Sequence, residues 1–378
     1  MKRISNKIIL LAFALCFSTI SHAQIEAFQK LIAGKHNDYG ILYSLPNTHL
    51  RIEVEAEQTV KKKGEFFNYA QKYLGTANVI TEDSQSWTLK SVKVTSYGTP
   101  TDKKQYIMSF KAGSAPFLVV DKNGMPLAIN TTNVVTETHV PTESTPLTTS
   151  VLNDNAYTTA LSGELLASGS LARRAEIAAN TIYKIRESRT NFAIGEADQM
   201  PPDGESLKLV LNELNKQEEA LMALFLGTTQ TATAVKTFDY IPADSLDREV
   251  LMRISNINGI TSKDDYSGEP LYIKVTTLKK GYIPLDEKGL EKKLPKGAVM
   301  YNIPGKAKVE ISYEGKKWFE GTFDIAQLGV DFGLDPAIFT DKKNPSYVKF
   351  HPTTGGIHEL GAMSAEDKAN NSPSKEKE

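Results

Sequence analysis

The segment LARRAEIAANTIYKIRESRTNF, residues 171–192, begins the strongest structural pattern in this 378-residue chain. Its apolar side chains recur at alternating intervals of four and three residues, which is the period of one face of an α-helix. This stripe consists of Leu171, Ala175, Ala178, Ile182, Ile185 and Phe192, with Arg189 at one of its positions. A second stripe of the same period consists of Leu207, Leu211, Leu214, Glu218, Leu221 and Phe225. Asp203 is the expected N-cap of the second helix, and Gly227 ends it. Two stripes joined by a loop of about ten residues predict an αα-hairpin over residues 170–227.

Strand patterns precede the hairpin. Residues 50–56 alternate apolar and charged side chains, as a strand with one face in water does. Residues 64–75 change to helical spacing and end at Gly75, which predicts one short helix. Asn123 and Gly124 form the dipeptide that is typical of a tight hairpin turn. Residues 24–130 are therefore expected to form an N-terminal β-rich domain with one short helix.

Residues 131–169 are expected to form a linker, because threonine dominates their first half and large apolar side chains are few. A strand over 132–140 is the alternative, since threonine also favours strands. Residues 228–360 return to short strand patterns separated by glycine, proline and charged residues, which predicts a C-terminal β-rich domain. The charged end, residues 361–378, is expected to be a disordered tail. The predicted fold class is α+β, with two β-rich, sandwich- or barrel-like parts flanking a long αα-hairpin.

Residues 1–23 have the features of a cleavable signal peptide. Three basic residues precede an apolar run, and Ala23 supplies the small residue at the cleavage point. The apolar run is shorter than the roughly 20 residues that a transmembrane helix needs. The alternative to a signal peptide is a helix buried in the core of the protein. Leu15 stands before Cys16, where a lipoprotein signal requires a small residue, so no lipid anchor is expected. The protein is expected to be exported to the periplasm or to the outer membrane's surface, and not to span a membrane.

The charge and cysteine content exclude several classes of protein. The chain has 44 basic and 45 acidic residues, and removal of the leader takes away three basic residues, which leaves a formal net charge of −4. A dedicated nucleic-acid-binding protein has a basic excess, so no nucleic-acid partner is expected. The only cysteine, Cys16, lies in the leader. Thiol catalysis and thiolate metal sites are therefore not expected in the mature chain.

No sequence motif for catalysis or for nucleotide binding is complete in this chain. His351 and His358 are expected to meet on a turn around residues 355–356, but two imidazoles without a third ligand favour surface histidines over a metal site. Several carboxylates are interpreted as solvated surface charge, because spacing along a chain does not establish the paired geometry of a glycosidase. They are Asp264, Asp265, Glu269, Asp331 and Asp335. No catalytic residue, metal or cofactor is assigned.

Aromatic side chains are the remaining candidates for ligand contact. Trp87 and Trp318 lie in strand patterns, where a core or cross-strand contact is the ordinary role. Stacking on sugar rings is the alternative role for both. Tyr69 and Tyr73 are open to the same two interpretations.

Two further positions are candidate sites. Ser245, within the tripeptide Asp-Ser-Leu at 244–246, resembles the acceptor for O-glycosylation of exported Bacteroidetes proteins and is a candidate glycosylation site. Arg186 and Arg189 lie one helical step apart, and the second helix offers Glu213 and Glu218 opposite them. The simpler interpretation is an interhelical ion pair, with Arg186 close to Glu213. The alternative is a cationic contact for a partner, so both arginines are candidate interaction residues.

Three stretches together resemble a known family. They are residues 40–57, residues 64–75 with the sequence GEFFNYAQKYLG, and the hairpin with its Arg186-x-x-Arg189 and Pro201-Pro202-Asp203-Gly204 motifs. In this combination the chain resembles an exported Bacteroidetes family known as domain of unknown function 4831, over nearly all of the mature chain. The resemblance implies a cell envelope with two membranes and this architecture. It implies no activity, ligand or catalytic residue.

The expected function is that of a non-enzymatic envelope protein, a scaffold that uses its β-rich parts and its hairpin for binding or assembly. Its expected partner is an envelope protein or a glycan. The alternative is a carbohydrate-active protein, either a glycan binder or a glycoside hydrolase with a carboxylate pair. A membrane-surface role is disfavoured, because the chain has no basic amphipathic helix.

Overall fold

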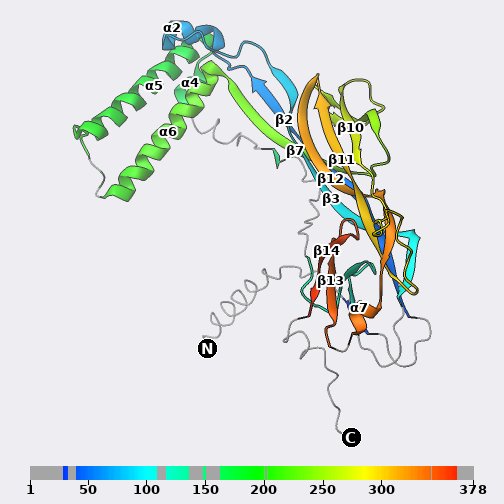
Figure 1. Cartoon of the computed structure of the whole chain (residues 1–378). Helices are drawn as coiled ribbons and strands as arrows, with labels where there is room; N and C mark the ends of the chain where they lie inside the picture. The colour runs from blue at the N-terminus through cyan, green and yellow to red at the C-terminus, as the bar shows by residue number, and fades with distance from the viewer. Residues whose placement is uncertain are drawn as a thin grey trace, which may run out of the picture.

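The structure is a computed structural model that describes residues 29–32, 40–108, 116–135, 148–149, 162–199, 201, 203–341 and 343–363. The predicted leader lies outside these residues, as do most of the predicted linker and most of the predicted tail. Within the described residues, two β-sheets pack against each other, a third sheet lies at one end of this pair, and a helical unit lies at the other end (Figure 1).

The predicted αα-hairpin is present, and it projects away from the sheets (Figure 1). Its helices are α5 (Leu171–Ile194) and α6 (Gly204–Leu226), and the short helix α4 (Gly163–Ala167) precedes them. Asp203 caps α6 as predicted, since its Oδ1 accepts a hydrogen bond of 2.7 Å from the backbone nitrogen of Ser206.

The base of the hairpin packs on the connection between β2 (Ile41–Lys62) and β3 (Ser84–Met108). This connection contains the 3-10 turn η1 (Phe67–Tyr69) and the helix α2 (Ala70–Leu74). Gly75 ends α2 in the left-handed conformation, as predicted, with a φ of 70°.

Residues of the same connection complete the core of the hairpin. The rings of Phe66 and Phe225 are fully buried, with 5.4 Å between their centroids. The backbone nitrogen of Phe66 donates a hydrogen bond of 2.6 Å to the carbonyl oxygen of Leu224. Gly64 permits this approach, because a Cβ at this position would lie 2.3 Å from the same oxygen. The segment GEFFNYAQKYLG thus anchors the hairpin to the sheets.

The central sheet has the strand order β3-β2-β7-β6, where β7 is Thr228–Tyr240 and β6 is Thr148–Thr149. β2 pairs antiparallel with β3 and with β7, so strands from before and after the hairpin are neighbours. Alternate side chains of β2 are buried, among them Leu50, Ile52 and Val54, as the pattern of residues 50–56 predicted.

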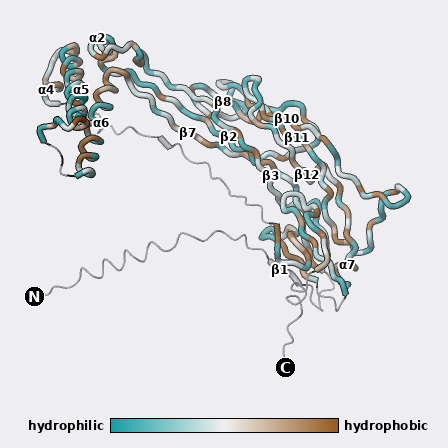
Figure 2. The backbone as a smooth tube through the Cα atoms, turned by 60° about the vertical axis from the view of Figure 1, so that its left-hand side comes forward, coloured by the Kyte–Doolittle hydropathy of each residue, from teal (hydrophilic) through white to brown (hydrophobic). Residues whose placement is uncertain are grey.

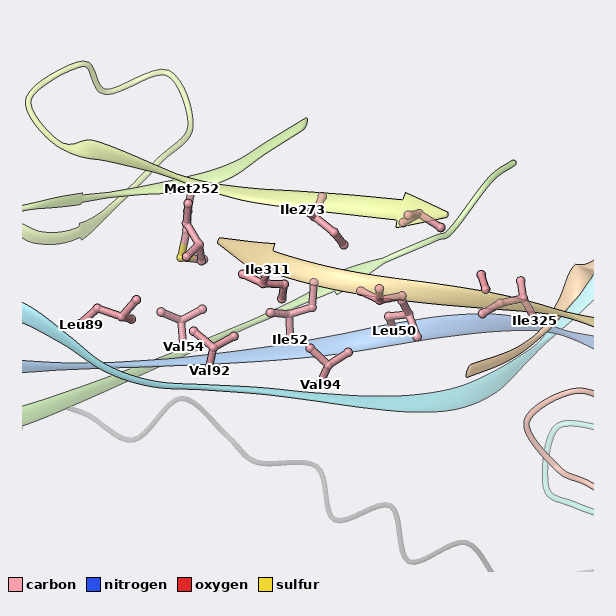
Figure 3. Close-up of a cluster of buried hydrophobic side chains, with 14 of the residues drawn as sticks. Leu50, Ile52, Val54, Leu89, Val92, Val94, Met252, Ile273, Ile311 and Ile325 are labelled. Carbon is pink, nitrogen blue, oxygen red and sulfur yellow. The ribbon is translucent and has the colours of Figure 1, made fainter. Parts of the chain in front are cut away.

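A second sheet, the facing sheet, packs against the central sheet. Its order is β12-β11-β10-β8-β9, and neighbouring strands are antiparallel. Its strands are β8 (Leu246–Ser255), β9 (Gly259–Thr261), β10 (Glu269–Lys279), β11 (Val299–Tyr313) and β12 (Lys316–Leu334). Figure 3 shows the core between the two sheets, in which Ile52 and Val94 of the central sheet face Ile273 and Ile311 of the facing sheet.

The end sheet lies farthest from the hairpin and has the order β1-β4-β5-β13-β14 (Figure 1). Its strands are β1 (Gln29–Ile32), β4 (Phe117–Val120), β5 (Pro126–Ile129), β13 (Ser346–Phe350) and β14 (Ile357–Ala362). The predicted turn at Asn123 and Gly124 connects β4 to β5. Its core includes Phe339 of α7 (Ala337–Thr340) and the near end of β2.

The fold class is α+β, as predicted, and the sheets are curled into a half-barrel. Along the chain, the helix pair lies between two β-rich segments. The segments 24–130 and 228–360 contribute strands to common sheets, since β2 pairs with β7 and β5 pairs with β13. β14 extends to Ala362, inside the segment expected as a tail. Figure 2 shows that hydrophobic residues gather in α6 and, at the opposite end, around β1.

Candidate functional site

Both tryptophans of the chain line one pocket of about 570 Å³ between the central and the facing sheet. Trp87 comes from β3 and Trp318 from β12, and Tyr266 and Tyr313 line the same cavity. We call this cavity the aromatic pocket. Its other lining residues are Thr88, Leu89, Ile254, Asn256, Ser267, Gly268, Glu269 and Glu314.

Backbone contacts hold Trp87 in the pocket wall. Its backbone nitrogen donates a hydrogen bond of 2.8 Å to the carbonyl oxygen of Asn256, which ties β3 to the β8–β9 turn. Gly259 lies against the indole: a Cβ at this position would be 2.9 Å from Cδ2 of the ring, and its φ is +74°. Only glycine adopts this φ without strain and also leaves room for the ring. The Gly259 backbone therefore supports the indole.

A β-bulge sets the direction of Trp318. Lys317 pairs with Ser312 and Phe319 pairs with Ile311, so Trp318 is the extra residue on its strand. Bulges re-aim a side chain out of the regular alternation of a strand. As a result, Trp318 and Phe319 both pack against the core between the sheets, although they are consecutive.

The turn between β11 and β12 brings Glu314 to the rim of the aromatic pocket. Glu314 and Gly315 both have positive φ, +48° and +74°, as in the tight two-residue turns of hairpins. Glutamate rarely adopts this conformation. The turn therefore holds an exposed carboxylate beside the aromatic rings.

Tyr266 is an exposed ring of the pocket, with 83% of its surface in solvent. The guanidinium carbon of Arg253 lies 4.5 Å from the centroid of its ring. Arg253 is itself fixed, since it donates hydrogen bonds to the carbonyl oxygens of Lys263, at 2.9 Å, and Gly268, at 3.1 Å. Tyr266 is thus a supported ring that stays available to a ligand.

The pKa of Tyr313 is raised to about 12, mainly by burial of the phenol and then by the carboxylates of Glu314 and Glu269. At neutral pH the hydroxyl therefore keeps its proton and donates a hydrogen bond to the Glu314 carboxylate. The pocket combines this hydroxyl, two carboxylate acceptors and flat aromatic surface, which is suited to recognition of a polar ligand with apolar faces.

Neutralising both carboxylates should lower the pKa of Tyr313. In the double variant Glu269→Gln, Glu314→Gln we expect the pKa of Tyr313 to fall below about 12. It should stay above the ordinary tyrosine pKa near 10, because the phenol is still buried. The ¹³Cζ resonance of Tyr313, assigned with Tyr313→Phe, measures this titration. An unchanged pKa would show that the carboxylates do not face the phenol.

The structure places the four aromatic residues named from the sequence in two separate pairs. Trp87 and Trp318, 231 positions apart in the chain, meet in the aromatic pocket. Tyr69 and Tyr73 instead pack against the core of the hairpin, with 6.2 Å between their ring centroids. Sequence reasoning missed Glu314, whose only signal is the Glu-Gly pair of the hairpin turn.

Of the carboxylates named from the sequence, Glu269 lines the aromatic pocket and Asp331 does not. Asp331 forms a separate polar cluster, in which Lys104, Tyr106 and Asn302 donate hydrogen bonds of 2.8 to 2.9 Å to it. The other three, Asp264, Asp265 and Asp335, lie outside helices and strands.

His351 and His358 meet as expected, with 3.2 Å between Nε2 of the first and Nδ1 of the second. Their rings are almost perpendicular, at 86°. Among the residues that the structure describes, no three histidines, aspartates or glutamates come together in a group that could hold a metal ion.

Arg186 and Arg189 both bind Glu218 of α6. Arg186 Nε lies 2.6 Å from one carboxylate oxygen of Glu218, and Arg189 Nη1 lies 2.8 Å from the other. The expected partner of Arg186, Glu213, is exposed and is contacted by Gln217 instead. The predicted interhelical ion pair is therefore confirmed, but with Glu218 as the partner of Arg186. Glu213 was the wrong choice because the two helices are offset by more than one turn from the alignment assumed.

Replacing Glu218 should weaken the hairpin modestly. We expect Glu218→Gln to lower the free energy of unfolding by about 1 kcal/mol, because the arginines are partly exposed and ion pairs of this kind contribute little. Glu213→Gln is the matched control on the same helix, with an expected change within about 0.5 kcal/mol. Urea denaturation measures both, and equal effects would contradict the assignment of Glu218.

Ser245 is exposed in the connection between β7 and β8. Its hydroxyl oxygen accepts a hydrogen bond of 3.0 Å from the backbone nitrogen of Thr277. Asp244 beside it binds Lys280 Nζ at 2.5 Å. The pKa of Asp244 is lowered to about 2, first by Lys280 and then by the backbone nitrogen of Ser245 and the hydroxyl of Thr277.

The Asp244 cluster should make stability depend on pH. A carboxyl whose pKa is lowered by folding stabilises the native state above its ordinary pKa, near 3.8, and loses this effect as the pH falls towards about 2. We therefore expect Asp244→Asn to be slightly less stable than the parent protein at pH 6, and this difference to shrink by pH 3. Chemical denaturation at both values tests this, and a constant difference would contradict it.

A family model described as domain of unknown function (DUF4831) matches residues 39–358. The matched range includes the helical hairpin, the central and facing sheets and the aromatic pocket. No curated protein and no solved structure matches the chain. Over the described part of the chain, none of the helices has both the length and the apolar character that crossing a membrane requires.

Proposed function

This chain belongs to the family defined by the domain of unknown function DUF4831, and we propose that it is an exported, non-enzymatic binding protein of the cell envelope. Its ligand site is the aromatic pocket. The observation that carries the proposal is that the only two tryptophans converge there, from strands far apart in sequence, with two tyrosines beside them. Aromatic side chains with a few placed polar groups are typical of ligand sites.

Export is supported by the pattern of the first 23 residues, where a basic start, an apolar run and a small-residue exit occur in order. The family match begins at residue 39, after this segment. The mature protein, isolated from the cell that makes it, should begin at Gln24. Mass spectrometry of its N-terminal peptide measures this, and a mature chain that begins at Met1 would contradict export.

The surroundings of the carboxylates favour binding over catalysis. A general acid of a glycoside hydrolase is held in an apolar environment, which keeps its proton in place. Glu269 and Glu314 are both exposed to solvent at the rim. The second candidate function is still a carboxylate-pair glycoside hydrolase, because both glutamates border the same pocket. Glycan turnover that is abolished by Glu269→Gln or by Glu314→Gln would establish that candidate and overturn the first.

Site-directed photo-crosslinking in the native envelope tests whether the pocket is the binding site. Tyr266 is replaced by p-benzoylphenylalanine, which keeps an aromatic ring at the mouth of the pocket. Tyr282 is the matched control, since it is an exposed tyrosine on another loop, and Leu209 on α6 reports on the hairpin. We expect a discrete adduct from position 266 alone. Adducts from position 209 with none from 266 would place binding on the hairpin and overturn the proposal.

A further inference from the structure

Resting on this proposed function, we propose that the ligand of the aromatic pocket is an uncharged saccharide. The inference depends on three properties of the pocket, which are the rigidity of its rings, the polar groups at its rim and the arrangement of its charges.

The rings offer flat and fixed apolar surface. The backbone of Gly259 supports the indole of Trp87, and the bulge on β12 directs Trp318 inward. Both tryptophans are half-buried, so part of each residue faces solvent. Trp87 lies against the backbone of Gly259, and Trp318 packs on the core between the central and the facing sheet. A pyranose ring presents a face of C–H groups, and it fits a flat aromatic surface of this kind without needing a deep cavity.

The rim supplies partners for hydroxyl groups. The Tyr313 hydroxyl is hydrogen-bonded to Glu314, and the remaining carboxylate oxygens of Glu269 and Glu314 offer acceptors. The side chains of Asn256 and Thr88 are exposed beside them. Donors and acceptors around aromatic rings match a polyol, whereas a purely apolar ligand would leave these groups without hydrogen bonds.

The charges disfavour an anionic ligand, which would be repelled by the carboxylates of Glu269 and Glu314. The guanidinium of Arg253 lies 4.5 Å from the ring centroid of Tyr266, so one face of that ring is not open to a cationic ligand. The same carboxylates attract cations, and choline is therefore the competing ligand class that the test below includes. A neutral saccharide avoids the repulsion and uses the carboxylates as hydrogen-bond acceptors.

The fluorescence of the full chain tests this inference directly, because both tryptophans lie in the pocket and no other residue contributes indole emission. The probes are neutral cello-, malto-, manno-, xylo- and chito-oligosaccharides, polygalacturonate fragments as anions, and choline as a cation. We expect at least one neutral oligosaccharide to shift the emission and to protect the indoles from iodide quenching. Binding of choline or of polygalacturonate alone, or no binding of any neutral glycan at roughly millimolar concentration, would overturn the inference.

Variants separate loss of contact from loss of folding. Tyr266→Ala removes a ring that is 83% exposed, so it should fold normally and weaken binding of the glycan roughly tenfold. Tyr266→Phe keeps the ring and should bind within about twofold of the parent protein. Tyr282→Ala, at an exposed tyrosine outside the pocket, should leave the dissociation constant unchanged. Equal affinity in Tyr266→Ala and Tyr282→Ala would overturn the inference.

The two proposals fail in different ways. If position 266 crosslinks to a protein or a lipid and no neutral glycan binds, the pocket is still the binding site and only the ligand class is wrong. If position 266 gives no adduct, the proposed function is wrong and the saccharide inference is lost with it.

Discussion

Replacing Gly64 with alanine should lower the free energy of unfolding by about 2–4 kcal/mol. The added Cβ would lie 2.3 Å from the carbonyl oxygen of Leu224. The segment that follows β2 must therefore move away from the C-terminal turn of α6. Their separation strains or breaks the hydrogen bond from the Phe66 nitrogen to that oxygen and loosens the Phe66–Phe225 contact. We therefore expect the hairpin to become the least stable part of the molecule.

The matched control is Gly204→Ala, because Gly204 is the first residue of α6 and a Cβ there meets nothing within 4 Å. Alanine favours the helix, so this variant should be as stable as the parent protein or more stable by up to about 1 kcal/mol. Urea denaturation gives the free energies, and amide hydrogen exchange in α5 and α6 locates the loss. A Gly64→Ala protein within about 0.5 kcal/mol of the parent would contradict the packing described.

Replacing Gly259 with alanine should damage the aromatic pocket and lower the free energy of unfolding by about 2–4 kcal/mol. Two effects combine. Alanine at a φ of +74° is strained, and its Cβ would lie 2.9 Å from the indole of Trp87. Because the neighbouring backbone is held in a sheet, the indole has to move, so its emission spectrum should change as well.

Gly289→Ala separates these effects, since Gly289 has a φ of +75° and a Cβ there meets nothing within 4 Å. It should show only the strain, about 1–2 kcal/mol, and an unchanged emission spectrum. The difference between the two variants measures the contact between Gly259 and Trp87. Equal losses of stability with unchanged emission in both would mean that Gly259 does not support the indole.

Features with a local cause could be predicted from the sequence. The helical hairpin follows from the spacing of its apolar stripes, and its boundary at Asp203 follows from side-chain capping. The alternation of residues 50–56 follows from the two faces of a strand. The meeting of His351 and His358 follows from the short turn between them. In each case the interacting groups lie within one element or one turn.

Features that depend on pairing over long distances could not be predicted. The register of β2 on β7 joins residues that are about 180 positions apart, and no local pattern encodes it. The same is true of the offset between α5 and α6, which pairs Arg186 with Glu218 and not with Glu213. An apolar stripe determines which face of a helix is buried, but it does not determine how far one helix is shifted along the axis of the other.

The aromatic pocket, too, could be predicted from the sequence only in part. Trp87 and Trp318 were recognisable as candidates by residue type, with a core contact as the ordinary alternative. Their convergence depends on how the central sheet packs on the facing sheet, and the direction of Trp318 depends on one bulge. Both properties belong to the assembled sheets.

The central claim is that the ligand of this protein binds at the aromatic pocket. A ¹H–¹⁵N correlation spectrum of the full chain contains indole signals from Trp87 and Trp318 alone, so it reports on the pocket without any added label. The ligand recovered from the envelope by crosslinking is titrated into the labelled protein. We expect both indole signals to shift together with one dissociation constant, while backbone signals of α5 and α6 stay in place. Shifts confined to the helical hairpin, with both indole signals unmoved, would contradict the central claim.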